Sequence, residues 1–159
     1  MQDRCPQCGK ELPAGVPAWT RNLRVSDVMT ANPVTLGPED SLMRGVEVMR
    51  LHNIRRIPIV LGGKLVGLLA EGDLKRAQPS ILDSSQDDFN SIMEGTPIVR
   101  IMISNPITVD EGLPLGQAAE TLRETKFGAL PVMRGAELVG ILTDSDLLKS
   151  LAELLRHSG

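Results

Sequence analysis

Two short motifs in this 159-residue chain combine residue types that bind ligands or metals. In the second half, Gly140, Thr143 and Asp146 stand where an apolar run gives way to the start of a predicted helix. A hydroxyl donates and accepts hydrogen bonds, an ionised carboxylate accepts several, and the free N–H groups of a helix N-terminus attract anions. The same spacing is typical of a capping box, which satisfies the helix's own amides. The motif therefore predicts a ligand-binding corner, a helix cap, or both.

The other motif lies near the N-terminus, where Cys5 and Cys8 enclose two residues, as in the first half of a zinc ribbon. A structural zinc ion takes four ligands, and the chain offers no further cysteine and only two distant histidines. Three interpretations stay open: two chains pool their cysteines around one zinc ion, the pair is redox-active, or it is a remnant. The redox role is the least favoured, because no thioredoxin-like βαβ unit surrounds the motif.

The segments that must position the first motif occur twice. Residues 25–76 align without a gap with residues 98–149, so that Asp73 matches Asp146 and Pro58 matches Pro131. A repeat of this length is one supersecondary unit that cannot bury its apolar face alone. We therefore expect the two copies to dock against each other, with a cleft between them.

Each copy passes through the same succession of patterns. The patterns are, in order, an extended segment after a proline turn, a helix with one apolar face, a β-hairpin with glycine in its turn, and a second helix. The predicted segments are 32–36, 42–49, 57–69 and 71–76 in the first copy, and 105–109, 115–122, 130–142 and 144 to about 156 in the second. The fold class is therefore α/β (α+β), with a β-α-β-β-α order in each copy.

The chain divides into four parts by composition. We expect a partly extended head over 1–22, a first repeat over 23–77, a connector over 78–96 and a second repeat over 97–159. The connector is rich in serine, aspartate and proline, which is typical of turns and loops. A short helix through Phe89, Ile92 and Met93 is compatible with its apolar spacing.

Composition argues against several classes of partner. The net charge is −3, from 17 basic and 20 acidic residues spread along the chain, so no basic stripe favours nucleic acid. Aromatic stacking platforms are scarce, with only Trp19, Phe89 and Phe127. No apolar run approaches the roughly 20 residues of a membrane-spanning helix, and the N-terminal residues do not resemble a secretory signal. These features predict a cytoplasmic protein without a membrane segment.

The ordered motifs resemble the tandem cystathionine-beta-synthase (CBS) domain pair, also called a Bateman module. The resemblance rests on residues 28–30 and 101–102, on the strand 56–60 and above all on residues 140–146, and it covers the chain from Val25 onward. It implies two repeats packed sheet to sheet about a pseudo-twofold axis, often assembled into dimers. It also implies a regulatory module that senses adenosine-containing ligands.

In this family the ribose-binding motif consists of a glycine, two apolar residues, a Thr or Ser, two further residues and an Asp. Gly140, Thr143 and Asp146 match this motif. The resemblance therefore implies that Thr143 and Asp146 are ribose ligands. The first copy keeps Asp73 but has Ala70 in place of the hydroxyl. We therefore expect one occupied nucleotide site per chain, at Thr143 and Asp146, with the site at Asp73 empty or weaker.

Two arginines supply a candidate phosphate contact. Arg55 and Arg56 precede the first hairpin, where family members commonly carry basic residues, and their counterparts are Gly128 and Ala129. This asymmetry favours a phosphorylated ligand over bare adenosine, with Lys126 as an additional cation. We expect AMP, ADP or ATP rather than S-adenosylmethionine or NAD. Alternatively, both arginines only solvate a strand edge.

Aliphatic residues are expected to hold the adenine ring, because aromatic residues are so few. The candidates are Pro106, Ile107 and Thr108 of the extended segment, together with Ile141. Ile107 and Ile141 have an alternative role as ordinary core residues.

No pattern in the sequence favours catalysis, since there is no Gly-x-Ser-x-Gly elbow and no Walker loop. We therefore predict a non-enzymatic regulatory module, acting on an unidentified protein through a change of repeat or dimer orientation. The alternative is a structural dimerisation adaptor with an empty cleft, whose cysteine head contacts metal or a partner. A homodimer is expected because the helical faces over 42–49 and 147–155 hold more apolar surface than one small module can bury. Alternatively, the last helix packs within its own chain.

Overall fold

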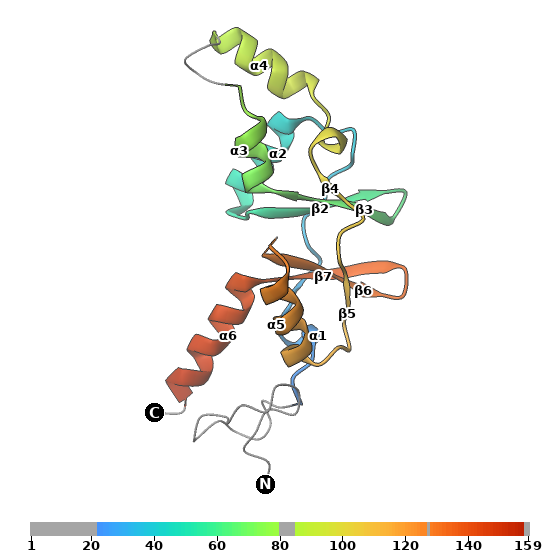
Figure 1. Ribbon diagram of the computed structural model, residues 1–159, viewed down its shortest axis with the longest axis vertical. Helices are drawn as coiled ribbons and strands as arrows, with labels where there is room; N and C mark the ends of the chain where they lie inside the picture. The colour runs from blue at the N-terminus through green and yellow to red at the C-terminus, as the bar shows by residue number, and fades with distance from the viewer. Residues whose placement is uncertain (1–21, 80–84, 127, 158–159) are drawn as a thin grey trace.

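The computed structural model describes residues 22–79, 85–126 and 128–157. They form two α/β repeats stacked along the long axis of the molecule, with their β-hairpins pointing in the same direction (Figure 1). Buried residues of β3 and β7 pack where the two sheets meet. This arrangement confirms the predicted fold class of two repeats packed sheet to sheet.

The order of elements is similar in both halves, although the second half begins with a 3-10 helix and has one additional short strand. The first half contains α1 (Val25–Val28), β1 (Thr30–Ala31), α2 (Leu42–His52), β2 (Arg56–Leu61), β3 (Lys64–Ala70) and α3 (Glu71–Ala77). The second contains the 3-10 helix η2 (Ile98–Arg100), β4 (Ile103–Ser104), β5 (Val109–Asp110), α5 (Leu115–Glu124), β6 (Ala129–Arg134), β7 (Glu137–Thr143) and α6 (Asp144–His157). Between them lies α4 (Gln86–Gly95). The predicted helices and hairpins are confirmed in both copies.

The first strand of each repeat pairs with the sheet of the other repeat. Strand β1 pairs antiparallel with β7, with Thr30 opposite Ile141, and β4 pairs antiparallel with β3, with Ile103 opposite Leu68. The strand orders are therefore β1-β7-β6-β5 in one sheet and β2-β3-β4 in the other. Because of this exchange, neither sheet is complete without the segment that leads into the other repeat.

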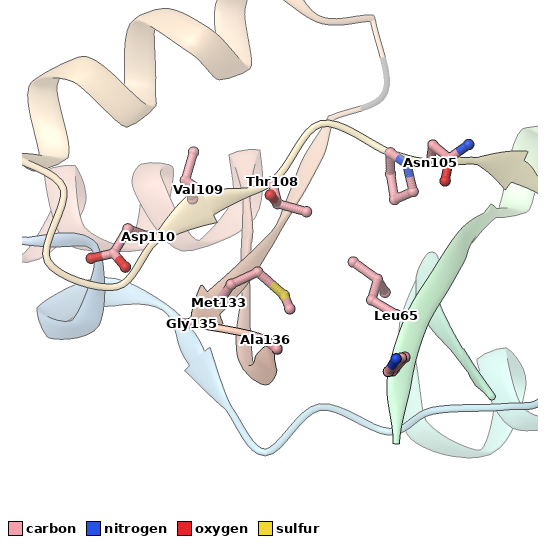
Figure 2. A pocket seen from close by; sticks show the side chains of 10 residues that line it. Leu65, Asn105, Thr108, Val109, Asp110, Met133, Gly135 and Ala136 are labelled. Carbon is pink, nitrogen blue, oxygen red and sulfur yellow. The ribbon is translucent and has the colours of Figure 1, made fainter. Parts of the chain in front are cut away.

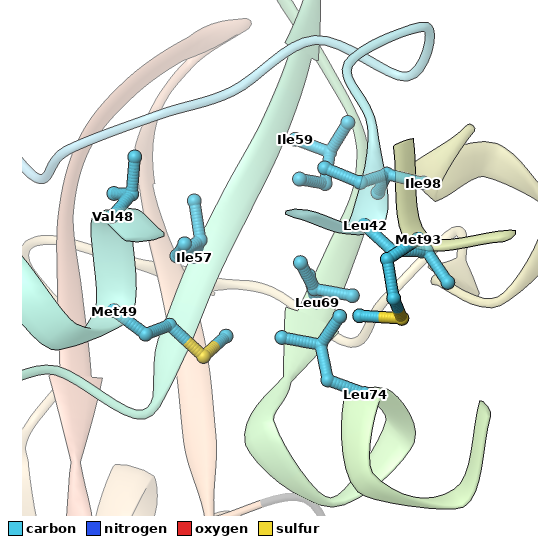
Figure 3. Packing of buried hydrophobic residues seen from close by; sticks show 9 residues of the cluster. All are labelled: Leu42, Val48, Met49, Ile57, Ile59, Leu69, Leu74, Met93 and Ile98. Atoms are coloured by element: carbon cyan, nitrogen blue, oxygen red, sulfur yellow. The ribbon is translucent and has the colours of Figure 1, made fainter. Parts of the chain in front are cut away.

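The exchange extends into the two hydrophobic cores. Val25 of α1 is buried with Leu122 and Leu142 of the second repeat, whereas Ile98 of η2 is buried with Leu42 of the first. Figure 3 shows the first core, in which residues of α2 and α3 close over the buried face of β2 and β3. Burying apolar side chains from both repeats in each core stabilises their relative position.

Glycine permits the close approach of the exchanged strands. A Cβ atom on Gly140 would lie 2.4 Å from Sδ of Met29 and 3.0 Å from the carbonyl oxygen of Thr30. The equivalent position, Gly67, would meet Met102 and Ile103 at the same two distances. A larger residue at either position therefore requires the methionine side chain and the neighbouring carbonyl group to shift.

The structure differs from the sequence-based expectation in two places. The strands that precede Pro33 and Pro106 lie at residues 30–31 and 103–104, whereas the predicted segment 32–36 joins the first sheet only through a bridge between Leu36 and Ile59. In the connector, the short helix that was compatible with Phe89, Ile92 and Met93 is present and is longer than that spacing indicated, as the ten-residue α4; Ser85 caps it by accepting a hydrogen bond from the N–H of Asp88 at 3.1 Å.

Candidate functional site

The N-terminus of α6 carries the predicted motif in a tight hydrogen-bonded arrangement. Oδ2 of Asp146 accepts from the backbone N–H of Thr143 at 2.9 Å and from its hydroxyl at 3.1 Å, and the N–H of Asp146 lies 3.2 Å from that hydroxyl. Both side chains are half-buried. The capping role is therefore present in the structure, and it fixes the carboxylate at the end of β7.

A third residue completes this second-repeat corner, and the sequence-based argument did not include it. Thr30 of β1 donates a hydrogen bond from Oγ1 to Oδ1 of Asp146 at 3.0 Å. The aligned residue in the second copy is Ile103, so the polar Thr30 of the first copy corresponds to an apolar residue of the second. That difference between the copies is the sequence signal that singles out Thr30.

Arg56 lies beside the second repeat although it belongs to the first. Gly128 has a φ of +68°, and a Cβ built on it would lie 2.6 Å from Nη2 of Arg56 and 3.3 Å from Oδ2 of Asp144. Because Gly128 has no side chain, the guanidinium of Arg56 reaches the first turn of α6. This places a cation of one repeat next to the corner formed by the other.

Arg55 has a different position from Arg56. Its side chain is exposed, and its Nε lies 3.8 Å from Oε2 of Glu71 at the start of α3, in its own repeat. The pKa of Glu71 is lowered, first by a hydrogen bond from Lys75 at 2.7 Å and then by the charges of Lys75, Arg55 and Arg56. The predicted arginine pair is thus divided between the two helix N-termini.

The first-repeat corner, formed by Ala70 and Asp73, is simpler. Oδ2 of Asp73 accepts from the N–H of Ala70 at 3.3 Å, and its Oδ1 forms an ion pair with Arg76. No hydroxyl stands at position 70, and Ile103 occupies the place that Thr30 has in the other corner. The two corners therefore share a carboxylate and a backbone geometry but differ in the polar groups around it.

The residues proposed for the adenine ring do not gather at the second-repeat corner. Pro106 and Thr108 line a groove of about 640 Å³ that runs between the two hairpin tips and contains neither Thr143 nor Asp146 (Figure 2). Ile107 is half-exposed, and Ile141 is buried between the sheets with Leu68, as its alternative core role predicted. The physical reason is the strand exchange, because β4 directs residues 106–108 along the hairpin of the first repeat.

A second groove, of about 480 Å³, lies beside the second-repeat corner between α5 and α6. Arg56 and Lys126 line it together with Gly128 and Asp144. Its remaining lining residues are Ala119, Leu122, Arg123, Thr125, Leu147 and Leu148. The two basic side chains that were expected near a phosphate thus share one groove next to α6.

Together these groups present a surface with a defined chemistry. A hydroxyl, a carboxylate and backbone amides suit the hydroxyl groups of a ligand, and a nearby guanidinium suits an anionic group. The described residues include no group of three or more His, Cys, Asp or Glu side chains placed to hold a metal ion. Cys5 and Cys8 lie outside the described residues.

In the part of the chain with described coordinates, no helix is both long and apolar enough to cross a bilayer. The two repeats themselves, at residues 25–80 and 98–153, match the family model described as "CBS domain". These two matches together span well over half of the chain.

Several curated proteins are similar to this chain. A CBS domain-containing protein of Dictyostelium discoideum is 30% identical over 134 residues, which are 82% of this chain and 92% of that protein. An uncharacterized 33.4 kDa protein of Thermofilum pendens is also 30% identical, but the chain spans only 44% of its length. An inosine-5′-monophosphate dehydrogenase of Korarchaeum cryptofilum is 29% identical, and the chain spans 23% of it. Some relatives therefore carry the pair as one region of an enzyme.

Solved structures agree with the fold. A putative acetoin utilization protein of Vibrio cholerae is 32% identical with a TM-score of 0.73, covering 85% of this chain and 96% of that one. The CBS domain pair of protein MJ0100, in complex with 5′-methylthioadenosine and S-adenosyl-L-methionine, is 27% identical with a TM-score of 0.69, covering 82% and 97%. The CBSX2 protein of Arabidopsis thaliana, in complex with AMP, is 27% identical with a TM-score of 0.68, covering 82% and 97%. The family model, the relatives and the paired fold together lead to one conclusion: this chain belongs to the CBS domain family and contains a tandem CBS domain pair.

Proposed function

We propose that this chain is a regulatory module that binds an adenine nucleotide at the second-repeat corner, formed by Thr30, Thr143 and Asp146. One observation carries the proposal: the hydroxyl and carboxylate corner lies at the N-terminus of α6, and the guanidinium of Arg56 from the other repeat approaches the same end of that helix at Gly128 and Asp144. Ribose hydroxyls donate to a carboxylate, and phosphates pair with a guanidinium. Two structural relatives bind AMP, or S-adenosyl-L-methionine and 5′-methylthioadenosine.

The cations near this corner favour AMP, ADP or ATP. Arg56 and Lys126 line the same groove beside Gly128 and Asp144. A phosphate there offsets the positive charges of Arg56 and Lys126, whereas the sulfonium of S-adenosylmethionine adds a further positive charge to a groove that also holds Arg123. A ligand held by Asp146 and Arg56 contacts both repeats and so favours one relative orientation, which a partner protein can read.

The same reasoning predicts one strong site per chain. The first-repeat corner has no hydroxyl at Ala70 and has Ile103 where the other corner has Thr30. Its carboxylate, Asp73, is also paired with Arg76, which competes with any ligand. We therefore expect a weaker or empty site there.

Calorimetric titration with AMP tests the proposal. Wild-type protein is expected to bind about one AMP per chain, Asp146→Asn to lose binding, and the matched variant Asp73→Asn to keep it. Circular dichroism checks that each variant is folded. Two equal sites per chain would contradict the proposal, and so would unchanged AMP binding by Asp146→Asn.

A second titration separates the phosphate contact from the ribose contact. Arg56→Gln is expected to weaken AMP binding by about ten- to a hundredfold, because a charge-assisted hydrogen bond contributes about 1.5–3 kcal/mol, and to leave adenosine binding nearly unchanged. An equal loss for adenosine and AMP would show that Arg56 only holds the repeats together. No binding of AMP, ADP, ATP, S-adenosylmethionine or NAD would favour the alternative of a structural adaptor.

A further inference from the structure

Two methionines lie at equivalent positions in the two repeats, each directly before an exchanged strand. Met29 precedes β1 and Met102 precedes β4. The Sδ atom of Met29 packs on Gly140 of β7, and that of Met102 packs on Gly67 of β3. A Cβ atom built on either glycine would lie 2.4 Å from the sulfur, so each thioether is in close contact with the strand that it covers.

The backbone holds both methionines in the same way. The N–H of Met29 donates to the carbonyl oxygen of Val25 at 2.9 Å, and the N–H of Met102 donates to that of Ile98 at the same distance. Val25 is fully buried in the core of the second repeat, and Ile98 is fully buried in the core of the first. Each methionine therefore lies between a buried anchor and the exchanged strand that follows it.

The two methionines differ from the core methionines in their exposure. Met29 and Met102 are half-buried, whereas Met49 and Met93 are 6% and 1% exposed in the first core. Oxidation of a thioether to the sulfoxide depends on access to the sulfur, and it changes a flexible apolar side chain into a polar one. Partial exposure thus makes Met29 and Met102 accessible to a small oxidant, while burial protects the core methionines.

We propose that Met29 is a redox-sensitive contact, whose oxidation by a peroxide loosens β1 on β7 and thereby weakens ligand binding at the second-repeat corner. In this step the sulfur takes one oxygen atom from hydrogen peroxide: the O–O bond breaks, an S–O bond forms and water leaves. The sulfur loses two electrons and the peroxide gains them. The effect on ligand binding rests on the proposed function, whereas the effect on the strand pairing does not.

The residue that follows Met29 links it to the ligand corner. Thr30 pairs with Ile141 of β7 and donates a hydrogen bond to Oδ1 of Asp146 at 3.0 Å. A sulfoxide oxygen needs a hydrogen-bonding partner, which the close contact with Gly140 does not provide, so burying it there is unfavourable. The oxidised side chain therefore turns away from Gly140, β1 shifts with it, and Asp146 loses the hydrogen bond that orients Oδ1.

Met102 has no such link to a ligand corner. The residue that follows it is Ile103, whose side chain forms no hydrogen bonds. Asp73 of the first-repeat corner instead accepts from the N–H of Ala70 and pairs with Arg76. Oxidation of Met102 is therefore expected to loosen β4 on β3 and to lower stability, without changing AMP binding at the second-repeat corner.

Calorimetric titration with AMP after treatment with hydrogen peroxide tests the effect on binding, and peptide mass spectrometry measures the oxidation of each methionine. Oxidised wild-type protein is expected to bind AMP at least about tenfold more weakly than untreated protein. Met29→Leu keeps the side-chain volume but has no sulfur, so it is expected to keep its affinity after treatment. Met133→Leu removes another half-buried methionine, and this control is expected to lose affinity as wild type does.

Methionine sulfoxide reductase should restore AMP binding to the oxidised wild-type protein, because it reduces the sulfoxide back to the thioether. A Met29 that stays unoxidised while Met133 is oxidised would overturn the proposal. An equal loss of AMP affinity in treated Met29→Leu and treated wild type would also overturn it.

Thermal unfolding without nucleotide tests the strand contact separately from the proposed function. Treated wild-type protein is expected to have a Tm several degrees below that of untreated protein, and the double variant Met29→Leu/Met102→Leu is expected to change much less. If untreated protein binds no AMP but the Tm falls in this way, the proposed function fails and the redox-sensitive contact stands. An unchanged Tm in wild type that is oxidised at Met29 would overturn the contact itself.

Discussion

Thr30 donates a hydrogen bond to Oδ1 of Asp146 at 3.0 Å, across a sequence separation of 116 residues. The two residues belong to different repeats, so the hydrogen bond joins the lead-in segment of the first repeat to the helix N-terminus of the second. Both oxygens of Asp146 are thereby oriented, one by Thr30 and the other by Thr143. The carboxylate is held in place by protein groups and needs little reorganisation to accept a ligand.

Removing the Thr30 hydroxyl tests this contact. Thr30→Val keeps the side-chain shape but loses the donor, and we expect it to lower the free energy of unfolding by about 0.5–1.5 kcal/mol. Urea denaturation followed by circular dichroism measures the change. Thr35→Val, at an exposed position of the same segment, is the control and is expected to change stability by less than about 0.5 kcal/mol. Equal effects of the two substitutions would argue against a role for the hydrogen bond.

The close approach at Gly140 leads to a second prediction. Gly140→Ala inserts a methyl group against Sδ of Met29 and the carbonyl oxygen of Thr30, so we expect a loss of roughly 1–3 kcal/mol in the free energy of unfolding. Gly116→Ala is the matched control, because no heavy atom lies within 4 Å of the added Cβ in α5. That substitution is expected to be neutral or to stabilise the protein by up to about 1 kcal/mol. A neutral Gly140→Ala would contradict the packing of β1 on β7.

The first-repeat corner can be altered to resemble the second. Ala70→Thr adds the missing hydroxyl beside Asp73, and we expect stronger AMP binding at this corner together with a stability gain of about 0.5–1 kcal/mol from the improved helix cap. Calorimetry measures the number of AMP molecules bound per chain, which should rise above that of wild type. Asp73→Asn in the Ala70→Thr background should reverse the gain in binding. If the stoichiometry does not change, the missing hydroxyl is not what weakens this corner.

The ion pair between Arg134 and Glu111 predicts a local pH dependence. Arg134 donates from Nε to Oε1 of Glu111 at 2.6 Å and from Nη2 to Oε2 at 3.1 Å, which lowers the pKa of Glu111 and raises that of Arg134. A lowered carboxyl pKa contributes stability that is present above the ordinary pKa of about 4.3 and is lost as the pH falls through the lowered pKa. NMR titration of the Glu111 carboxyl carbon measures this pKa directly.

In that titration, Arg134→Gln should return the pKa of Glu111 toward its ordinary value. Because both side chains are at the surface, the accompanying change in stability should be small and should decrease further in high salt. Arg100→Gln, an exposed arginine of η2, is the control and should leave the Glu111 pKa where it is. A pKa that stays lowered in Arg134→Gln would assign the shift to another group.

The local elements could be predicted because their periodicity is visible in the sequence. The apolar spacing of α2 and α5, the glycine turns of the hairpins and the capping box at Thr143 and Asp146 each need only a few neighbouring residues. The order of predicted elements, repeated in both copies, predicted the fold class. The lack of a hydroxyl at Ala70 distinguished the first-repeat corner from the second-repeat corner. These features depend on local backbone preference and on which face of an element must be buried.

The strands β1 and β4 could not be predicted, because each has only two residues and no periodicity to identify it. For this reason the sequence predicts Pro106, Ile107 and Thr108 at the same site as Thr143, whereas the structure places them near the hairpin of the first repeat and brings Thr30 to Asp146 instead. No local sequence pattern indicated that Arg55 would lie near Glu71 of its own repeat and Arg56 near Gly128 of the other.

The sequence by itself determined the elements of each repeat and the chemical groups available at each helix N-terminus. Only the tertiary structure decided which groups meet, since the pairing of β1 with β7 and the approach of Arg56 to Gly128 join segments far apart in the chain. The physical reason is that edge-strand pairing and contacts between repeats gain their energy from packing of the whole molecule. That energy depends on how two surfaces fit together, which no short window of residues encodes.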